Sequence, residues 1–309
     1  MKDDFSHFPV LLDECIEGLN IRPGGSYLDG TVGGGGHAAE IAKRLNGGYL
    51  FCIDKDPDAV RTASARLACY PNAEVMRGDF RNARGLLCGK TKSIDGAILD
   101  LGVSSYQLDS PSRGFSYKHD GPLDMRMSQS GVTAAEIINR YSEESLRDII
   151  FSLGEEKYAA NIARKILQTR TEKPIETTAE LARTVTSALP PQVRRKEKNP
   201  ARKTFMALRI TANDELEALK EGLNDIFGML ADAGRLCVIT FHSLEDRIVK
   251  QFFVSQTQGC ICPKQFPVCV CGNTPKARMI NKKPVTASQR EISLNKRARS
   301  AKLRILEKL

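Results

Sequence analysis

Residues 28–37 read LDGTVGGGGH, and this stretch decides the fold of the chain. A short apolar run ends at Asp29, four consecutive glycines follow, and a helix-compatible stretch begins at His37. Glycine lets the backbone turn tightly and approach a ligand with no Cβ in the way. The helix presents unpaired N–H groups at its start. Strand, glycine turn and helix start together predict a nucleoside-cofactor cradle in an α/β sheet.

Two acidic residues bear on which cofactor the cradle holds. The pattern Gly33-x-Gly35-x-x-Ala38 also fits a dinucleotide fingerprint. Asp54 lies 21 residues after Gly33, and its carboxylate could accept hydrogen bonds from the ribose hydroxyls of NAD or of S-adenosylmethionine. Asp29, at the end of the first strand, would repel a pyrophosphate but suits a sulfonium and an α-amino group. Charge therefore favours S-adenosylmethionine. A nicotinamide-dependent oxidoreductase remains the alternative, as does a glycine-rich surface loop without a ligand.

Length and composition limit the class of protein. The chain has 309 residues, enough for about two domains, and is 41% hydrophobic. It has no run of 18 apolar residues, and its first residues lack an apolar signal region. We therefore expect a cytoplasmic protein that does not engage a membrane.

The net charge of +9 is concentrated at one end of the chain. Residues 276–309 hold 11 Lys or Arg against 2 Asp or Glu, and the rest of the chain is balanced. A second basic cluster comprises Arg194, Arg195, Lys196, Lys198, Arg202 and Lys203. Two basic patches on a neutral body favour a nucleic-acid partner, with a solvated tail as the alternative. Apolar residues within the tail predict that part of it packs on the body.

Strands and helices alternate in the first part of the chain. Apolar runs predict strands at 26–29, 49–54, 73–77 and 94–101, separated by helices at 37–45 and 58–68 and preceded by a helix at 11–19. This alternation predicts a parallel sheet with crossover helices.

The next convincing strand, 235–241, comes roughly 130 residues later, far more than one crossover needs. The intervening stretch reads as helical, with capping boxes at Thr133/Glu136 and Thr177/Glu180 and helices at 155–169 and 205–230. We expect a discontinuous sheet domain, 1–105 and 214–309, and a helical insertion, 106–213, that recognises the substrate.

Acidic residues end the predicted strands. Asp29, Asp54 and Asp100 close three of them, and Asp79 follows another by two residues. A single acid of this kind is usually a turn or cap residue. Four of them at the carboxyl ends of parallel strands, where ligands bind, predict a functional edge.

His242 lies at the same edge after the fifth predicted strand, where it could face a substrate, although a lone histidine is more often structural. The next residue, Ser243, is predicted to cap a helix with Asp246 as its return partner.

Four cysteines form one close cluster, Cys260-x-Cys262-x6-Cys269-x-Cys271. A reducing compartment disfavours disulfides, and four thiolates could hold a structural zinc ion. The one-residue spacing within each pair is unusual, although Pro263, Pro267 and Gly272 would allow a tight turn. Four reduced cysteines without metal are the alternative.

Six segments together resemble one family, the ribosomal small-subunit methyltransferase H family, also called MraW. These segments are His7–Pro23, Asp29–His37, Leu99–Gln107, Arg113–Met127, Thr240–Lys250 and Asn295–Arg304. The resemblance implies a Rossmann-like, S-adenosylmethionine-dependent methyltransferase sheet with an inserted all-helical domain. It also implies methyl transfer to the N4 amine of a cytosine in the decoding region of 16S ribosomal RNA, within the small subunit.

The resemblance further implies a set of cofactor contacts: Gly35, Gly36, His37, Asp54, Phe80, Asp100 and Gln107. In this reading Phe80 lies against the adenine, Asp54 holds the ribose, and the backbone amides at 35–37 hold the methionine part. Asp29 joins the set on the charge argument. The sequence departs from the general methyltransferase pattern at Thr31, where a glycine is usual, and after Asp100, where the Asp-Pro-Pro-Tyr motif of many amino-methyltransferases is absent.

The substrate side of the predicted site is less sharply defined. Asp100 is the candidate catalytic residue, because a carboxylate that accepts the hydrogens of the cytosine amine would free lone-pair density for attack. The candidates for the RNA side, besides His242, are Arg113, Phe115, Asp124 and Arg126, with a purely structural loop as the alternative. A non-catalytic RNA-binding factor of ribosome assembly is the remaining alternative function.

Overall fold

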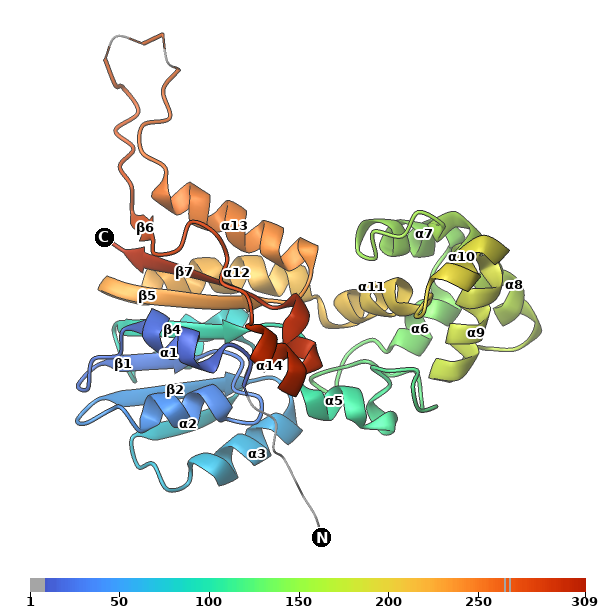
Figure 1. Cartoon of the computed structure of the whole chain (residues 1–309), viewed down its shortest axis with the longest axis horizontal. Coiled ribbons are helices and arrows are strands. Elements are labelled where there is room, and N and C mark those ends of the chain that lie inside the picture. The colour runs from blue at the N-terminus through green and yellow to red at the C-terminus, as the bar shows by residue number, and fades with distance from the viewer. Residues whose placement is uncertain (1–8, 264, 267) are drawn as a thin grey trace. The chain divides into compact units, whose positions relative to one another are not determined.

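The computed structural model describes residues 9–263, 265–266 and 268–309 (Figure 1). His7 and Phe8 of the first family segment, and Pro267 of the cysteine cluster, lie outside the described residues. The chain divides into two compact units. The sheet unit comprises residues 1–102 and 216–309, and the helical unit comprises Val103–Glu215, against predicted boundaries of 106 and 213 for the insertion.

The sheet unit is built on a seven-stranded sheet of order β3-β2-β1-β4-β5-β7-β6. Its parallel strands are β1 (Ser26–Asp29), β2 (Tyr49–Asp54), β3 (Ala73–Arg77), β4 (Ile94–Asp100) and β5 (Leu230–Thr240). The antiparallel strands are β6 (Ala277–Met279) and β7 (Lys302–Lys308). The prediction of a Rossmann-like α/β sheet is confirmed. The predicted bounds of β1, β2 and β3 are also confirmed, whereas β5 begins five residues earlier than the predicted 235.

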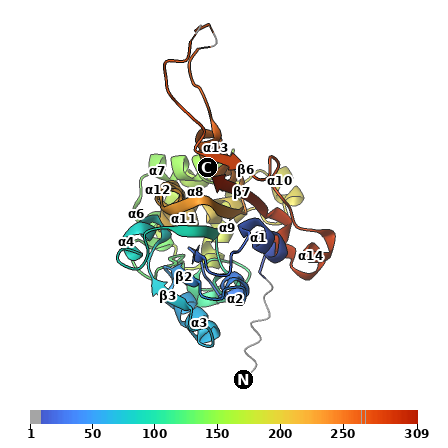
Figure 2. The ribbon, with the colours of Figure 1, turned by 90° about the vertical axis from the view of Figure 1, so that its left-hand side faces the viewer.

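Alternating side chains of the strands build two separate cores, because successive residues point to opposite faces. One face packs Tyr27, Cys52 and Ile98 against α1 (Leu12–Leu19), α2 (Gly36–Ala42) and α3 (Pro57–Leu67). The other face packs Leu28, Phe51 and Leu99 with α4 (Ala83–Leu86), α12 (Glu215–Met229) and α13 (Ser243–Thr257). Helices thus cover both faces of the sheet (Figure 2).

Part of the basic tail becomes a sheet strand. After α14 (Gln289–Leu294) and the short 3₁₀ helix at Lys296–Ser300, β7 lies between β5 and β6. Leu303 and Leu306 are fully buried, and Glu307 pairs with Arg235 and Arg278 across the two neighbouring strands. The prediction that the tail packs on the body is confirmed. Its strands were not predicted, because the run KLRILEK has no clean two-residue alternation.

The helical unit has a core of its own, formed by buried residues such as Leu146, Ile162 and Leu181. Its helices are α5 (Ser105–Asp109), α6 (Ala134–Arg140), α7 (Glu143–Ser152), α8 (Ala159–Glu172), α9 (Thr178–Ala188), α10 (Pro191–Lys196) and α11 (Arg202–Asn213). The two predicted capping boxes are confirmed at the starts of α6 and α9. In the described part of the chain, no helix is both long and apolar enough to cross a membrane.

Three predicted helices have the wrong bounds. The helix predicted at 37–45 spans Gly36–Ala42 and so ends three residues early. The helix predicted at 205–230 is interrupted at Asp214, whose left-handed φ of 50° ends α11, and α12 starts at Glu215. Aspartate tolerates this conformation better than most residues. The helix predicted at 155–169 instead spans Ala159–Glu172, because Glu155 also has a positive φ of 49°.

Candidate active site at the carboxyl edge of the sheet

The glycine loop between β1 and α2 needs glycine at specific positions. Gly33 and Gly35 have left-handed φ values of 51° and 75°, and Gly35 is the N-cap residue of α2. A Cβ on Gly36 would lie 2.3 Å from Cγ of Pro9. At Gly34, by contrast, a Cβ would meet no atom within 4 Å. The loop thus packs closely against Pro9 at Gly36 and has open space beside Gly34.

The strand register places three of the four predicted aspartates on one face of the sheet. Asp29 pairs with Cys52 of β2 and with Ile98 of β4. Asp54 and Asp100 each lie two residues beyond those partners, so their side chains point to the same face as Asp29. The cluster formed by Asp29, Asp54 and Asp100, hereafter the carboxylate edge, therefore spans three adjacent strands.

Asp29 is the central member of the carboxylate edge. Its side chain is almost completely buried and accepts a hydrogen bond from the backbone N–H of Thr31, 3.2 Å from Oδ1. Burial raises the pKa of Asp29 to about 7, with a further contribution from the nearby Asp54 carboxylate. A carboxyl group of this kind gains stability when a cation neutralises it.

Asp54 ties the glycine loop to the sheet. Its carboxylate accepts hydrogen bonds from the backbone N–H groups of Gly33 and Asp56, each at 2.9 Å. Burial raises the pKa of Asp54 to about 6 although these two hydrogen bonds act in the opposite direction. Asp54 therefore has a structural role in ordering the loop as well as its predicted role toward a ribose.

Asp100 is the least satisfied of the three carboxylates. Its Oδ1 is buried and has no hydrogen-bond partner among the described residues. Burial, together with the smaller effects of the Asp29 and Glu245 carboxylates, raises the pKa of Asp100 to about 8. Its backbone N–H donates to Oγ1 of Thr31 at 2.6 Å, so the threonine that departs from the glycine pattern links the β1 loop to the end of β4.

His37 presents a neutral imidazole beside Asp100. Nε2 of His37 lies 3.0 Å from the carbonyl oxygen of Val10, so this nitrogen carries the proton and Nδ1 is left as an acceptor. Burial lowers the pKa of His37 to about 4. Nδ1 lies 3.9 Å from Oδ2 of Asp100. An ammonium group of a ligand that lies beside both atoms could donate one hydrogen bond to each of them.

Asp79 does not belong to the carboxylate edge, which corrects the prediction of four acids acting together. Its carboxylate caps the 3₁₀ helix Phe80–Asn82 by accepting the N–H of Arg81 at 3.1 Å. It also lies 3.7 Å from Nζ of Lys55. Asp79 is thus a cap residue with cationic neighbours.

Phe80, the predicted adenine contact, is held against α12. A Cβ on Gly222 of that helix would lie only 2.4 Å from the Phe80 ring. The absence of a side chain at Gly222 therefore allows the ring to pack directly on the helix backbone. This contact fixes the position of Phe80 beside the sheet edge.

The N-terminus of α13 differs from the prediction. The N-cap residue is His242 rather than Ser243, and the return partner is Glu245 rather than Asp246. The buried Glu245 accepts the N–H groups of Phe241 at 2.8 Å and His242 at 3.2 Å, and its other oxygen lies 3.0 Å from Nε2 of His242. Asp246 instead binds Lys302 and Arg304 of β7, because β7 passes beside this helix.

Gln107 lies in the helical unit, in a capping box at the start of α5. Its Oε1 accepts the N–H of Ser104 at 2.9 Å, and the hydroxyl of Ser104 accepts the N–H of Gln107 at 3.2 Å. The side chain is buried. The predicted cofactor role of Gln107 stays a prediction.

The predicted RNA-side residues form a tightly bonded loop in the helical unit. The buried Arg113 donates to the carbonyl oxygens of Arg126 at 2.9 Å and Met127 at 3.0 Å, and lies 5.8 Å from the centroid of the Phe115 ring. Arg126 makes a two-bond contact with Asp124. Although burial opposes it, this contact holds the pKa of Asp124 below its usual value. These four side chains brace the loop, and their contact with a substrate stays a prediction.

Asn213 is a residue that the sequence analysis missed. Its side-chain amide accepts the N–H of Met127 at 2.7 Å and donates to the carbonyl oxygen of Met125 at 2.7 Å. Met125 has a positive φ of 61°, which is a strained conformation for this residue. Asn213 therefore holds a strained loop in place. A lone asparagine at the end of a helix gives no sequence signal for this role.

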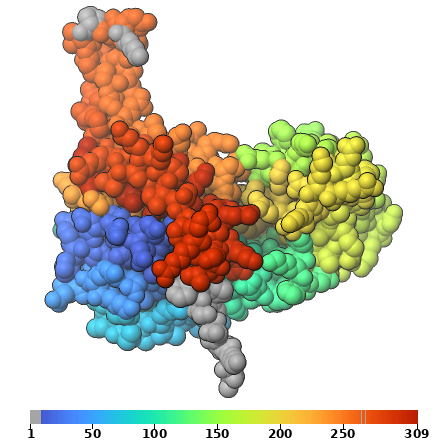
Figure 3. Space-filling view, in the orientation of Figure 1, coloured from blue at the N-terminus to red at the C-terminus, as the bar shows by residue number. Residues whose placement is uncertain are grey.

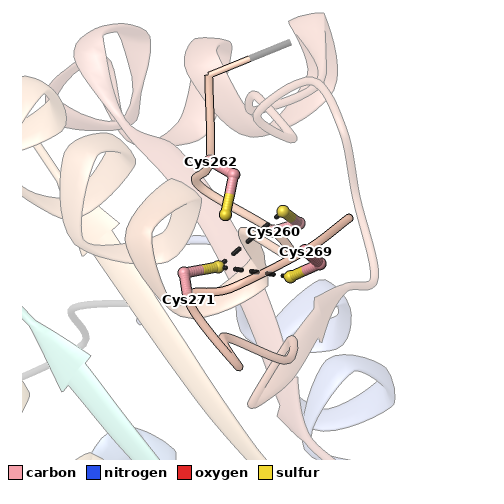
Figure 4. Close-up of side chains that lie close together, drawn as sticks. All are labelled: Cys260, Cys262, Cys269 and Cys271. Atoms are coloured by element: carbon pink, nitrogen blue, oxygen red, sulfur yellow. Dashed lines mark hydrogen bonds between the residues drawn. The ribbon is translucent and has the colours of Figure 1, made fainter. Parts of the chain in front are cut away.

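The predicted metal ligands come together in the sheet unit. The sulfur atoms of Cys260, Cys262, Cys269 and Cys271 all lie within 4.8 Å of one another (Figure 4). None of these residues contributes to the carboxylate edge.

The profile of the family described as the MraW methylase family matches residues 4–309. The chain belongs to this family. It is 47% identical over 310 residues to the ribosomal RNA small subunit methyltransferase H of Finegoldia magna, with 99% of each chain covered. It is 50% identical over 309 residues to the protein of the same name from Carboxydothermus hydrogenoformans, again with 99% of each covered.

Solved structures are less similar than these relatives. An rRNA methylase from Streptococcus thermophilus is 12% identical, covers 96% of this chain and 93% of its own, and has a TM-score of 0.41, which is too low to bear on function. Membership of a methylase family confirms the predicted resemblance and the prediction of a methyltransferase. It leaves the nicotinamide-dependent alternative without support.

Proposed function

We propose that this chain transfers a methyl group from S-adenosylmethionine to the N4 amine of a cytosine in the decoding region of 16S ribosomal RNA. The observation that carries the chemistry is the carboxylate edge beside an open glycine loop, with Oδ1 of Asp100 buried and unpaired. The choice of small-subunit RNA comes from the names of the relatives. The choice of N4 and of the decoding region comes from the family resemblance.

The residues at the edge fit this cofactor on the basis of charge. S-adenosylmethionine carries a sulfonium and an α-ammonium group. Both cations would offset the desolvation cost of ionising the buried Asp29 and Asp100 carboxyl groups. A pyrophosphate would add negative charge to the same place. Nδ1 of His37 supplies a further acceptor for an ammonium group beside Asp100. When bound, the cofactor supplies an electrophilic methyl group.

The role proposed for Asp100 is to accept a hydrogen bond from the cytosine amine. That amine is a poor nucleophile, because its lone pair is delocalised into the ring, and an acceptor for its hydrogens returns electron density to nitrogen. The free Oδ1 of Asp100 is the acceptor available at the end of β4. The bond from N4 to the methyl carbon would form as the methyl–sulfur bond breaks, the thioether would leave as the second product, and the proton lost from N4 would pass by way of Oδ1 of Asp100 to solvent. The rest of the catalytic effect comes from alignment of the reacting atoms. The target base has to leave its stack to enter the site.

Exposed basic side chains are proposed to bind the RNA backbone. In the tail, the pairs with Glu307 and Asp246 occupy Arg278, Lys302 and Arg304. Lys296 and Arg299 remain exposed. In the helical unit, Arg194, Arg195 and Lys196 on α10 are also exposed. These two sets are the candidates for phosphate contacts.

The test is methyl transfer to small ribosomal subunits that lack the modification. The purified protein and methyl-labelled S-adenosylmethionine are incubated with intact subunits or with free 16S RNA, and the digested nucleosides are identified by mass spectrometry. We expect N4-methylcytidine in a single fragment from the decoding region. Label on another base would overturn the atom assignment. Tight RNA binding with no transfer on either substrate would favour the non-catalytic assembly factor.

A further inference from the structure

The segment between α13 and β6 extends away from the layers of the sheet unit (Figures 1 and 3). It exposes its large apolar side chains, among them Ile261 at 59% and Val270 at 73%. Exposed apolar residues supply none of the burial that normally offsets the entropy cost of ordering a loop. Another interaction is needed to hold this segment in one conformation.

The four cysteine side chains of this segment point toward one another from two facing stretches of chain (Figure 4). Sγ of Cys271 lies 3.6 Å from that of Cys269 and 3.7 Å from that of Cys260, and all four sulfur atoms lie within 4.8 Å of one another. A tetrahedral zinc ion with Zn–S bonds of about 2.3 Å places its sulfur ligands about 3.8 Å apart. The separations of 3.6 and 3.7 Å match that geometry, and the remaining sulfur atoms lie no more than 4.8 Å apart.

Backbone N–H groups point at the cysteine sulfur atoms. The N–H groups of Ile261 and Asn273 each lie 3.4 Å from Sγ of Cys271, and that of Val270 lies 3.3 Å from Sγ of Cys262. Donors of this kind stabilise a thiolate, which is the form that binds a metal. The side chain of Asn273 also donates to the carbonyl oxygens of Gln258 and Gly259, which closes the base of the segment.

Disulfide bonds do not account for the cluster. All four cysteines are free, and sulfur atoms 3.6–3.7 Å apart are far from the roughly 2.05 Å of a disulfide. Four thiolates packed together without a counter-ion would repel one another. A divalent cation at their centre removes that repulsion.

We propose that Cys260, Cys262, Cys269 and Cys271 bind one Zn²⁺ ion as a closed tetrathiolate centre. Four protein ligands leave no open position for water, so the ion has a structural rather than a catalytic role. It orders the segment between α13 and β6 in place of a hydrophobic core. The centre shares no residue with the carboxylate edge and is independent of the proposed reaction.

The first test is the metal content of the full-length protein, purified under reducing conditions without chelator. We expect one zinc per chain by mass spectrometry, falling at least tenfold in Cys260→Ser and in Cys271→Ser. Cys69→Ser and Cys88→Ser are matched controls, since both residues are exposed cysteines outside the cluster, and should keep their zinc. Equal zinc loss in the control variants would overturn the assignment.

The second test reads the site directly. Replacement of zinc by Co²⁺ should give the visible absorption of a tetrahedral tetrathiolate, absent from Cys271→Ser. Hydrogen exchange at the amides of Ile261, Val270 and Asn273 should accelerate when a chelator removes the metal, while exchange in β1 and β4 stays unchanged. The proposal fails if the reduced protein takes up no zinc, if iron is the only bound metal, or if the intact mass reveals two disulfides. None of these readouts requires methyl transfer.

Discussion

The carboxylate edge and the loop at residues 113–127 both concentrate charged side chains, and they differ in how those charges are satisfied. In the loop, the guanidinium of Arg113 donates to two carbonyl oxygens, and Arg126 forms an ion pair with Asp124. At the edge, burial leaves Asp29 and Asp100 with raised pKa values, and Oδ1 of Asp100 has no partner among the described residues. A charge that is buried and unmatched costs stability, so its presence points to a ligand that the site is built to receive.

The largest expected effect is on activity at the edge. Asp100→Asn keeps the shape of the side chain but removes its charge, and we expect a loss of methyl transfer of about 10²–10³-fold with the fold intact. The measurement is labelled methyl transfer to small subunits, with far-ultraviolet circular dichroism to confirm folding. Asp232→Asn is the matched control, because Asp232 is exposed near the start of β5 and lies outside the carboxylate edge. Turnover at the wild-type rate in Asp100→Asn would remove Asp100 from the mechanism.

The next effect should be on the stability of the loop. Arg113→Ala leaves the carbonyl oxygens of Arg126 and Met127 without a donor and opens a gap beside Phe115. We expect a loss of about 2–4 kcal/mol in the free energy of unfolding of the helical unit. Denaturant titration followed by hydrogen exchange in α6 and α9 measures it. An unchanged midpoint together with weakened RNA binding would instead make Arg113 a substrate contact.

Cofactor binding should depend on pH, because the cations of S-adenosylmethionine interact with the ionised carboxylates of the carboxylate edge. In the free protein, Asp29 and Asp100 have pKa values of about 7 and 8, so below these values a cation can bind only as protons are released. The affinity for S-adenosylmethionine should therefore rise as pH increases from 6 to 8, by up to about tenfold per unit for each proton released, and then level off. Calorimetry in buffers of different ionisation enthalpy reports the proton release directly. A flat affinity across this range would contradict the charge argument.

The same carboxyl group should affect the ligand-free protein in the opposite direction. Because the folded-state pKa of Asp100 is raised above the unfolded value, its proton stabilises the fold below about pH 4, and this contribution is lost as pH rises through about 8. Asp100→Asn should therefore be more stable than the wild type at pH 8.5, by up to about 5 kcal/mol, because the pKa is raised by about four units and each unit corresponds to about 1.4 kcal/mol. At pH 5 most of this difference should disappear. Thermal melts at the two pH values make the comparison.

The smallest expected effect is on RNA affinity. The double variant Lys296→Gln, Arg299→Gln should lower the slope of log affinity against log salt by about 1.5, because each neutralised phosphate contact contributes about 0.7–0.9. Filter binding to 16S RNA at several salt concentrations gives the slope. Arg278→Gln is the control, since Arg278 is engaged with Glu307. A slope in the double variant equal to that of the wild type and of Arg278→Gln would mean that Lys296 and Arg299 do not contact phosphate.

Local sequence patterns were sufficient to predict the sheet edge. The strands of the first half, the glycine loop and the acids that end β1, β2 and β4 follow from short apolar runs and the positions of their breaks. The two capping boxes in the helical unit were predicted for the same reason, because a cap depends on residues three apart.

Features that depend on distant contacts could not be predicted from the sequence. Asp79 resembles the other aspartates until Lys55, which follows a different strand, is found beside it. Asp246 binds Lys302 and Arg304 of β7, and Glu245 rather than Asp246 is the return partner of the capping box at His242. Asn213 acts on a loop about 86 residues away in the sequence, and the strain it holds at Met125 leaves no local pattern. In each case a tertiary contact outweighed a local preference.

The position of β7 also dictates an order of assembly. β6 is made before β7, yet its sheet partner is β7, which lies between it and β5. During translation, residues 277–279 therefore have to wait until 302–308 emerge and insert alongside β5. The β5 edge of the sheet is covered only when β7 is in place, so a chain whose synthesis stops before residue 302 has a bare β5 edge that is prone to join another polypeptide.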